Sequence, residues 1–326
     1  MDLHYPTFRV ATGGQTFESG LSQGPVKILV ERDLAPGADR FRLEFPGGTD
    51  LSFEMDEPVT IGLGYAGQDS DVITGHVSGN AVTLSRLMVT GFTPLAKLAA
   101  LRVAQVYEGQ KAGDIVSDLC GTAGVDTGTV GQGTAFPAYY LDRDKNGLEH
   151  IHELARKSGF IVFTDPEGKL HFGEPAGTEH VLTYGENLIG CVQVNTQKLY
   201  SGVRVFGESP ASTEGDQAAS WLTRDENVVK GEAGEMSGNL LWITDESLRT
   251  QEAAAKRAEA EYARIEKGIL HGRLTLLGNP ELSPGDTVRI EGISKIEPAK
   301  SLMITGLVHR LSPSDGFVTT ADFREA

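Results

Sequence analysis

The chain has 326 residues, of which 39% are hydrophobic and 23% charged, so it has the apolar side chains for a folded core and is not expected to be disordered. At roughly 100–200 residues per domain, this length predicts two or three domains. There are 29 lysines and arginines against 45 aspartates and glutamates, and the resulting net charge of −16 argues against direct reading of nucleic acid.

The start of the chain and its cysteines bear on the cellular compartment. Residues 1–10 lack the basic and apolar segments of a signal peptide, and no run reaches the ~18 apolar residues of a membrane-spanning helix. We therefore expect synthesis and assembly in the cytoplasm. Cys120 and Cys191 form no C-x-x-C pair, which excludes a zinc site built on thiolates and predicts two buried free thiols.

Residues 1–92 are predicted to form a first β-barrel domain. Their apolar residues are β-branched or alternate with polar ones, and Gly, Pro, Asp and Asn separate the segments. The expected strands are FRLEF (41–45), VTIGLGY (59–65), VITGHV (72–77) and AVTLSRLMV (81–89).

Residues 93–178 are predicted to form a small α/β insertion domain. Apolar residues at helical spacing indicate helices within TPLAKLAALRV (93–103), KAGDIVSDLCGTAGV (111–125) and NGLEHIHELARKSGF (146–160). Gly121 or Gly124 can end the second helix, and Gly159 ends the third. A β-hairpin is expected at 160–175, with its turn at Asp165–Gly168.

Residues 179–326 are predicted to form a second β-barrel domain with one long helix. Asp245 can cap this helix, Gly268 ends it, and its alanine-rich stripe permits close packing on a sheet or another chain. A polar loop is expected at 207–217. The expected strands are GCVQVNT (190–196), SGVRVFG (201–207), GRLTLLG (272–278), DTVRIEG (286–292), SLMITGLVHRL (301–311) and FVTTADF (317–323).

The two β regions resemble each other in the order of their segments. The signature I-T-G-x-V occurs at Ile73–Val77 and again at Ile304–Val308. A V-x-I strand precedes each copy, at Val59–Ile61 and at Val288–Ile290. This order predicts an internal duplication, with two similar barrels separated by the insertion.

Several short motifs suggest cofactor or catalytic sites, but their context favours plainer interpretations. The G-x-G-x-x-G match at 62–67 lies between two strands, whereas a dinucleotide site needs a helix after it. His150 and His152 are two residues apart, not the four of a zinc-binding helix. Cys120 falls on an apolar helix face, and no G-x-S-x-G occurs. We therefore predict no enzyme, no catalytic residues and no cofactor.

The stretch DRDKNGLEHIHE (142–153) matches the written pattern of a calcium-binding EF-hand loop. Asp142, Asp144, Asn146 and Glu153 are its candidate ligands. A strand-like segment precedes the stretch where an EF-hand has a helix, and the chain has no second loop. A helix that starts near Gly147, capped by Asp144 or Asn146, explains the same residues and is the favoured interpretation.

Five segments in order resemble a known family, the late control gene D baseplate hub proteins of contractile phage tails. These hubs are related to the N-terminal part of the VgrG proteins of type VI secretion. The resemblance spans nearly the whole chain. The segments are FRVATGGQTF (8–17), VYEGQKAGDIVSDLCGTAGV (106–125), YYLDRDKNGLEHIHELARKSGFIVFTDPEGKLHFGEP (139–175), LTYGENLIGCVQVNTQKLYSGVRVFG (182–207) and AEAEYARIEKGILHGRLTLLGNPELSPGDTVRIEGI (258–293).

The resemblance implies a structural hub of a phage, prophage or tailocin-like particle. Such hubs are homotrimers in which two related barrels per chain give a pseudo-sixfold ring. The ring adapts a sixfold tail tube to a threefold spike. The implied partners are the tail tube initiator protein and the spike (central needle) protein, with the tape measure and baseplate wedge proteins as further candidates. The implied location is the baseplate of the virion or tail particle.

One departure from this family and two alternatives remain. VgrG chains continue into a β-helical spike and some phage hubs are followed by a lysozyme, whereas this chain stops at Ala326. We therefore expect the spike to be a separate protein. The alternatives are a calcium-dependent cell-surface or carbohydrate-binding module, based on 142–153, and a tail-associated peptidoglycan hydrolase.

Overall fold

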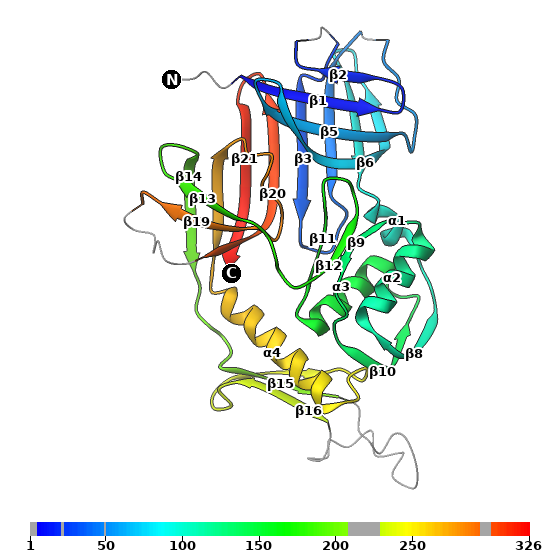
Figure 1. Cartoon of the computed structure of the whole chain (residues 1–326), viewed down its shortest axis with the longest axis vertical. Helices are drawn as coiled ribbons and strands as arrows, with labels where there is room; N and C mark the ends of the chain where they lie inside the picture. The colour runs from blue at the N-terminus through cyan, green and yellow to red at the C-terminus, as the bar shows by residue number, and fades with distance from the viewer. Residues whose placement is uncertain (1–4, 21–22, 49, 208–228, 294–300) are drawn as a thin grey trace.

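The structure is a computed structural model that describes residues 5–20, 23–48, 50–207, 229–293 and 301–326 (Figure 1). The polar loop expected at 207–217 lies outside these residues, apart from Gly207. Within the described part of the chain, no helix is both long and apolar enough to cross a membrane.

A 13-stranded sheet contains strands from both β regions and forms the upper part of the molecule in Figure 1. Its main path runs β14–β18–β21–β20–β3–β4–β7–β6–β5–β1–β2, and β19 and β13 extend from β20. The strands are β1 (Pro6–Thr12), β2 (Thr16–Glu18), β3 (Lys27–Asp33), β4 (Arg40–Pro46), β5 (Pro58–Tyr65), β6 (Gln68–Val82), β7 (Arg86–Phe92), β13 (Glu179–Thr183), β14 (Leu188–Asn195), β18 (Leu270–Leu277), β19 (Thr287–Glu291), β20 (Leu302–Ser312) and β21 (Gly316–Glu325).

The predicted α/β insertion is present as three helices and two small sheets. Asn146 caps the third helix, and Gly124 and Gly159 end the second and third helices in the left-handed conformation that glycine favours. The elements are α1 (Leu95–Ala100), β8 (Gln105–Lys111), α2 (Ala112–Ala123), β9 (Thr127–Val130), β10 (Ala135–Leu141), α3 (Gly147–Ser158), β11 (Ile161–Thr164) and β12 (Leu170–Gly173).

A further three-stranded sheet, which the sequence did not predict as a separate unit, lies at the lower end of Figure 1. It consists of β15 (Gly202–Phe206), β16 (Lys230–Gly234) and β17 (Leu240–Thr244), and α4 (Gln251–Lys267) packs on it. The packing is so close that a Cβ on Gly231 would lie 2.0 Å from the Ala254 carbonyl oxygen, so the absence of a side chain there permits it. The expected cap was wrong: Thr250, not Asp245, accepts the N–H of Ala253, whereas Gly268 ends the helix as predicted.

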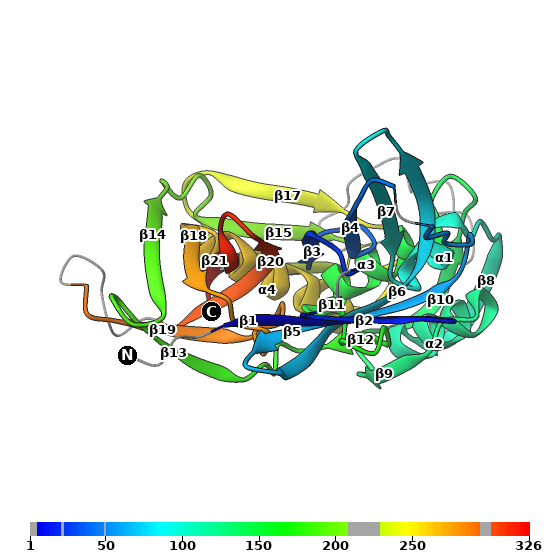
Figure 2. The same ribbon diagram turned by 90° about the horizontal axis from the view of Figure 1, so that it is seen from above.

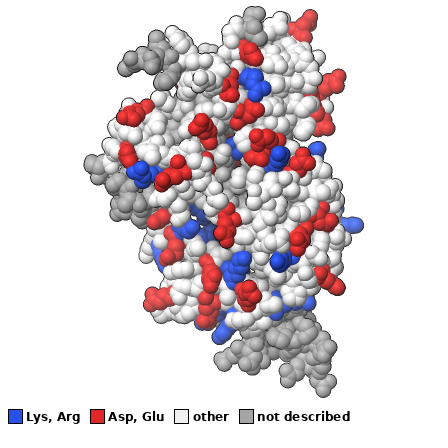
Figure 3. All heavy atoms as spheres, viewed as in Figure 1, with Lys and Arg blue, Asp and Glu red and all other residues white. Residues whose placement is uncertain are grey.

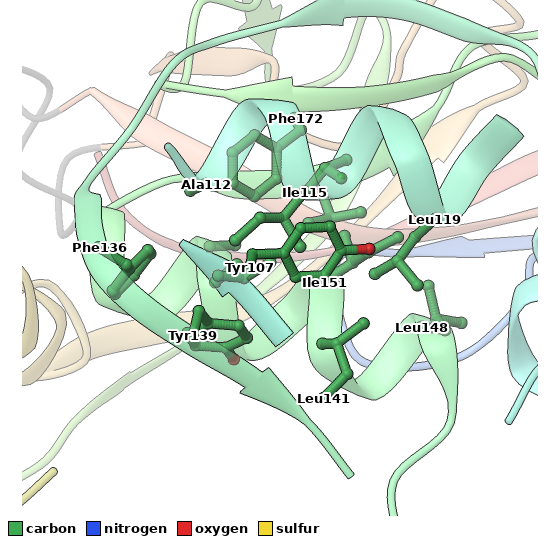
Figure 4. Close-up of a cluster of buried hydrophobic side chains, with 14 of the residues drawn as sticks. Tyr107, Ala112, Ile115, Leu119, Phe136, Tyr139, Leu141, Leu148, Ile151 and Phe172 are labelled. Atoms are coloured by element: carbon green, nitrogen blue, oxygen red, sulfur yellow. The ribbon is translucent and has the colours of Figure 1, made fainter. Parts of the chain in front are cut away.

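Buried apolar side chains form three clusters. One lies within residues 10–89, with Leu311 and Phe317 added, and a second lies within residues 182–323. The third fills the insertion (Figure 4) and continues into the sheet under α4. The mainly β fold class, with several sheets and few helices, is thereby confirmed, and strands of both β regions lie in one continuous sheet.

The two β regions repeat the same strand order. The first gives β5–β6–β7–β4–β3 across the sheet, and the second gives β19–β20–β21–β18–β14. All four neighbouring pairs in each set are antiparallel, and the chain visits equivalent strands in the same sequence. Ten strands therefore form two copies of one five-stranded unit.

The turn before β5 and the turn before β19 carry the same hydrogen bonds. Glu57 Oε2 accepts the N–H of Glu54 at 3.0 Å, and Asp286 Oδ2 accepts the N–H of Ser283 at 2.8 Å. The third residue of each turn has a positive φ, 65° at Asp56 and 93° at Gly285. The matched turns fix Val59 as the equivalent of Val288, as the V-x-I pattern predicts.

The I-T-G-x-V alignment, in contrast, was four residues out of register. Val77 exchanges backbone hydrogen bonds with the turn before β5, and Ile304 does the same with the turn before β19. A bulge follows each of them, ahead of Gly79 and Gly306. Ile304 is therefore the structural equivalent of Val77, and the recurrence at Ile73 reflects the similar composition of neighbouring strand residues.

The two units are joined by an antiparallel pair between β20 and β3. Gly306–Leu311 of the second unit pair with Ile28–Asp33 of the first. Because this pair is hydrogen-bonded like any other in the sheet, the second unit continues the sheet of the first without a break.

A buried arginine lies where the two β units and the insertion meet. Arg32 of β3, only 2% exposed, donates to the Thr164 carbonyl oxygen of β11 at 2.6 Å and to Ser283 Oγ at 3.3 Å. Its counter-ion is Asp39, with Arg32 Nε and Asp39 Oδ2 3.9 Å apart. The Thr164 hydroxyl also donates to Asp39. One ion pair thus holds three parts of the fold together.

We expect Arg32→Met to lower the free energy of unfolding by about 3–5 kcal/mol, because it leaves the Asp39 carboxylate buried without its counter-ion. The double variant Arg32→Met/Asp39→Leu removes both charges and should recover much of this loss. Urea denaturation followed by circular dichroism measures both. A single variant as stable as the double variant would contradict the role of the pair.

A buried histidine makes stability depend on pH. His309 is fully buried, its Nδ1 lies 2.9 Å from Thr319 Oγ1, and burial with the nearby Arg32 charge lowers its pKa to about 3. An unfolded chain takes up this proton near pH 6.5, so the contribution is complete above pH 6.5 and is lost as pH falls toward 3.

We expect the free energy of unfolding of the wild type to fall by about 1.4 kcal/mol per pH unit more than that of His309→Gln between pH 6 and pH 4. The variant keeps a neutral polar side chain that cannot titrate. Denaturant titrations of both chains at several pH values give the two slopes. Parallel slopes would show that His309 does not titrate on unfolding.

Candidate functional site

The stretch 142–153, the calcium candidate, is the connection from β10 into α3. Asp142 Oδ1 accepts the N–H groups of Asp144 and Lys145 at 3.0 and 3.1 Å. Asn146 and Glu149 form a reciprocal capping box, in which each side chain accepts the other's backbone N–H at 2.9 and 2.7 Å. These residues are therefore engaged in starting a helix.

Glu153, the last calcium candidate, is paired with two lysines. It contacts Lys145, and its Oε1 lies 3.0 Å from Lys157 Nζ. Burial alone would raise the pKa of Glu153, but the two lysine charges outweigh it and lower the pKa to about 2. Among the four calcium candidates, Glu153 has two lysine ammonium groups against its carboxylate, and these would compete with a metal ion for its oxygens.

Metal-ligand clusters are absent from the described residues, in which no three His, Cys, Asp or Glu side chains are grouped to hold an ion. Of the two histidines in the stretch, His150 Nε2 lies 3.0 Å from the Asp142 carbonyl oxygen. Burial lowers the pKa of His152 to about 4. These contacts favour the capped helix start over calcium or zinc binding.

The stretch lines a polar cleft of about 550 Å³ between α3 and the loop that follows β17. Lys157 lines this cleft and is 4% exposed; it pairs with Glu153 and donates to Asp245 Oδ1 at 3.0 Å and to Ser247 Oγ at 2.7 Å. An ammonium group has three N–H donors, so these partners occupy all of them. We assign Lys157 a structural role that ties the insertion to the α4 sheet.

The other motifs singled out in the sequence also have structural roles. Residues 62–67 form the end of β5 and a tight turn into β6, with positive φ at Ala66 and Gly67, so the glycine-rich hairpin is confirmed. Cys120 packs in the core of the insertion, and burial raises its pKa to about 12. Cys191 is only half-buried, so the prediction of two buried thiols holds for Cys120 alone.

Charge is distributed over the surface without a large area of one sign on the face in Figure 3, where lysines and arginines lie among aspartates and glutamates. The sequence missed a different surface feature. Exposed apolar side chains occur on β14, where Ile189 is 51% and Val192 62% exposed. The alternating apolar pattern of GCVQVNT was the available signal, but it cannot say that one edge of the strand stays open.

We expect Asp144→Ala to leave the melting temperature unchanged whether calcium or a chelator is present. The Asp144 carboxylate is not part of the capping box, and its neighbours hold the helix start without a metal. Differential scanning fluorimetry of the wild type and the variant in both buffers tests this. A calcium-dependent rise in the wild type that the variant loses would restore the calcium-site hypothesis.

Solved structures with the same fold include tail proteins and a secretion component. The 43 kDa tail protein of prophage MuSo2 from Shewanella oneidensis has a TM-score of 0.73 at 17% identity, covering 98% of both chains. The tail protein from Neisseria meningitidis MC58 also has a TM-score of 0.73, at 16% identity, covering 98% of this chain and 96% of that chain.

The third structure is the E. coli c3393 protein, described as a component of the type VI secretion system with structural similarity to the T4 bacteriophage tail proteins gp27 and gp5. It has a TM-score of 0.61 at 14% identity, covering 97% of this chain and 76% of that chain. At these identities the likeness concerns the fold. At that level it confirms the resemblance to baseplate hubs and their VgrG relatives.

No curated protein matches the chain significantly in sequence. A family model does match, the one described as the Alg8 N-terminal domain, and it covers residues 42–312. The matched range runs from β4 to the end of β20 and so includes the insertion and most strands of both β units. The chain belongs to the Alg8 N-terminal domain family.

Proposed function

We propose that the chain is the structural baseplate hub of a contractile phage tail or tailocin-like particle. It acts as a homotrimer whose two β units per chain form a pseudo-sixfold ring, which adapts the sixfold tail tube to the threefold spike. The division into units 1–92, 93–178 and 179–326 is part of this proposal. The fold shared with tail proteins supports a structural role in a tail.

The observation that carries the proposal is the repeated strand order. Two copies of one five-stranded unit in a single chain present two similar surfaces. Three such chains around a threefold axis present six, because each chain contributes both copies. A protein that joins a sixfold tube to a threefold spike needs three chains that present six similar surfaces.

The partners in this proposal are the tail tube initiator on one side and the spike protein on the other, with tape measure and baseplate wedge proteins as further contacts. The particle baseplate is the location. The role is non-enzymatic, since the buried lysine and cysteine described above are engaged in structural contacts.

We expect light scattering to give a mass of about 105 kDa, three times the chain mass of 34.9 kDa. A chelator should leave this mass unchanged, because the trimer does not depend on the 142–153 stretch binding calcium. Dimers or tetramers across a wide concentration range would argue against a threefold hub.

A further inference from the structure

Among the described residues, the strand edges of the large sheet without a strand partner include those of β14 and of the outer half of β6, besides those of β2 and β13. β14 pairs with β18 on one side only. β6 pairs with β5 as far as His76, and its remaining residues pair with β7 alone. Both edges expose apolar side chains, with Val192 62% and Val82 78% exposed. The two edges therefore have backbone donors and acceptors available for another chain.

Neither edge carries the features that usually prevent association. Proteins protect open edges with charged residues, especially lysine, or with proline. Residues 78–84 (SGNAVTL) and 190–196 (GCVQVNT) contain no Asp, Glu, Lys, Arg or Pro, in a chain of which 23% is charged. The uncharged, proline-free composition of these two edges is typical of strands that pair with another strand.

The internal repeat shows what can cover them. β20 is the equivalent of β6 and β3 is the equivalent of β14, and β20 pairs with β3 inside the chain. The equivalent pair, β6 with β14, cannot form inside one chain, because β14 and the β6–β7 hairpin lie on opposite sides of the molecule in Figures 1 and 2. It can form between two copies.

The register of this pair follows from the intrachain one. Arg42 of β4 and Arg273 of β18 are equivalent. Arg42 pairs with Leu29 of β3, and Arg273 pairs with Val192 of β14, so Leu29 corresponds to Val192. Two residues further along each strand, Glu31 corresponds to Val194. Ile304 corresponds to Val77, so Val308 corresponds to Ala81. Since Val308 pairs with Glu31, Ala81 is placed opposite Val194. The remaining pairs are Gly79 with Thr196, Asn80 with Asn195, Val82 with Gln193, Thr83 with Val192 and Leu84 with Cys191.

We infer that residues 79–84 of one copy pair antiparallel with residues 191–196 of a second copy, which makes the intermolecular contact a repeat of the intrachain β20–β3 pair. Eight strands lie on the path from β14 to β6. In a closed ring of copies joined in this way, each copy contributes these eight strands. That the ring has three copies rests on the proposed function, whereas the pairing itself rests on the repeat.

A disulfide across one predicted pair tests the register. Within the chain, the N–H of Leu34 donates to the Thr305 carbonyl oxygen, so these two residues form a hydrogen-bonded pair. Hydrogen-bonded and non-hydrogen-bonded pairs alternate along an antiparallel ladder, so Glu31 and Val308, three positions along, form a non-hydrogen-bonded pair. Its equivalent, Ala81–Val194, should bring the two Cα atoms to roughly 4.5 Å, which suits a disulfide. The variant is Ala81→Cys/Val194→Cys in a Cys191→Ala background, oxidised under mild conditions.

Two further variants control this experiment. Ala81→Cys/Gln193→Cys moves one cysteine by one residue to the opposite face of β14 and should not cross-link. Glu31→Cys/Val308→Cys is the intrachain equivalent, so it should form its bond within one chain and report that oxidation works. Non-reducing gels should show covalent dimers and trimers, and nothing larger, for the 81/194 variant alone.

The outcomes separate the pairing from the trimer. Cross-linking of 81/194 that stops at another number of chains supports the pairing and contradicts the threefold hub. A light-scattering mass of three chains without an 81/194 bond contradicts the pairing and leaves the hub standing. Equal cross-linking of 81/194 and 81/193, or none while 31/308 reacts, overturns the pairing.

A charged residue at the edge gives an independent test without cysteines. Val192→Lys places a lysine on β14 at a position already 62% exposed, so the single chain should keep its melting temperature while the assembled fraction falls. Val106→Lys is the matched control, at a valine of β8 that is 57% exposed and outside the predicted pair. Equal loss of assembly in both, or in neither, would overturn the pairing.

Discussion

The Arg32–Asp39 ion pair is the interaction that holds the three parts of this fold together. Taking two charges out of water is unfavourable, so such a pair is helped by further hydrogen bonds to its donors and acceptors. Here Thr164 of the insertion supplies both a carbonyl oxygen for the arginine and a hydroxyl for the aspartate. Ser283, in the turn before β19, supplies a contact from the second β unit. The insertion is therefore fixed against the seam between the units.

Around this junction the chain uses one design twice. Each five-stranded unit begins its β5-type strand with the same tight turn, and each has a bulge at the same place in its long strand. The second unit uses its long strand to bind the first, through β20 and β3. The first unit has a long strand of the same kind, and in the single chain its outer half has no equivalent partner among the described residues. This asymmetry within a repeat is the strongest indication that the single chain is an incomplete assembly.

Much of the fold was predictable because local rules determined it. The helix at Gly147–Ser158 is marked by Asn146, by its apolar spacing and by Gly159, so both ends were placed correctly. Several strand positions followed from alternation, and V-x-I located the repeat, but the strand predicted at 81–89 is divided between β6 and β7, and β3 was not predicted. The I-T-G-x-V alignment failed because neighbouring residues of a strand have similar composition, and only backbone pairing fixes a register. Likewise, Asp245 has the chemistry of a helix cap, but it binds Lys157, a residue 88 positions away, and Thr250 caps instead.

Of the candidate site, the capped helix start within residues 142–153 was predictable, because Asn146 directly precedes the apolar helical pattern. The buried roles of Arg32 and Lys157 left no sequence signal, since charged residues of the same kind usually lie on the surface. Open edges such as that of β14 depend on the order of strands in the sheet, which no local pattern specifies.

The β20–β3 seam also has a consequence for how the chain is made. β3 ends at Asp33 and its partner begins at Leu302, so a ribosome must add all the residues between them before the seam can close. Until then β3 and the apolar residues of the first unit lack one neighbour, and contacts between distant residues form slowly. The nascent first unit is therefore exposed to the wrong partners during synthesis. Its maturation is completed only after β20 has left the ribosome.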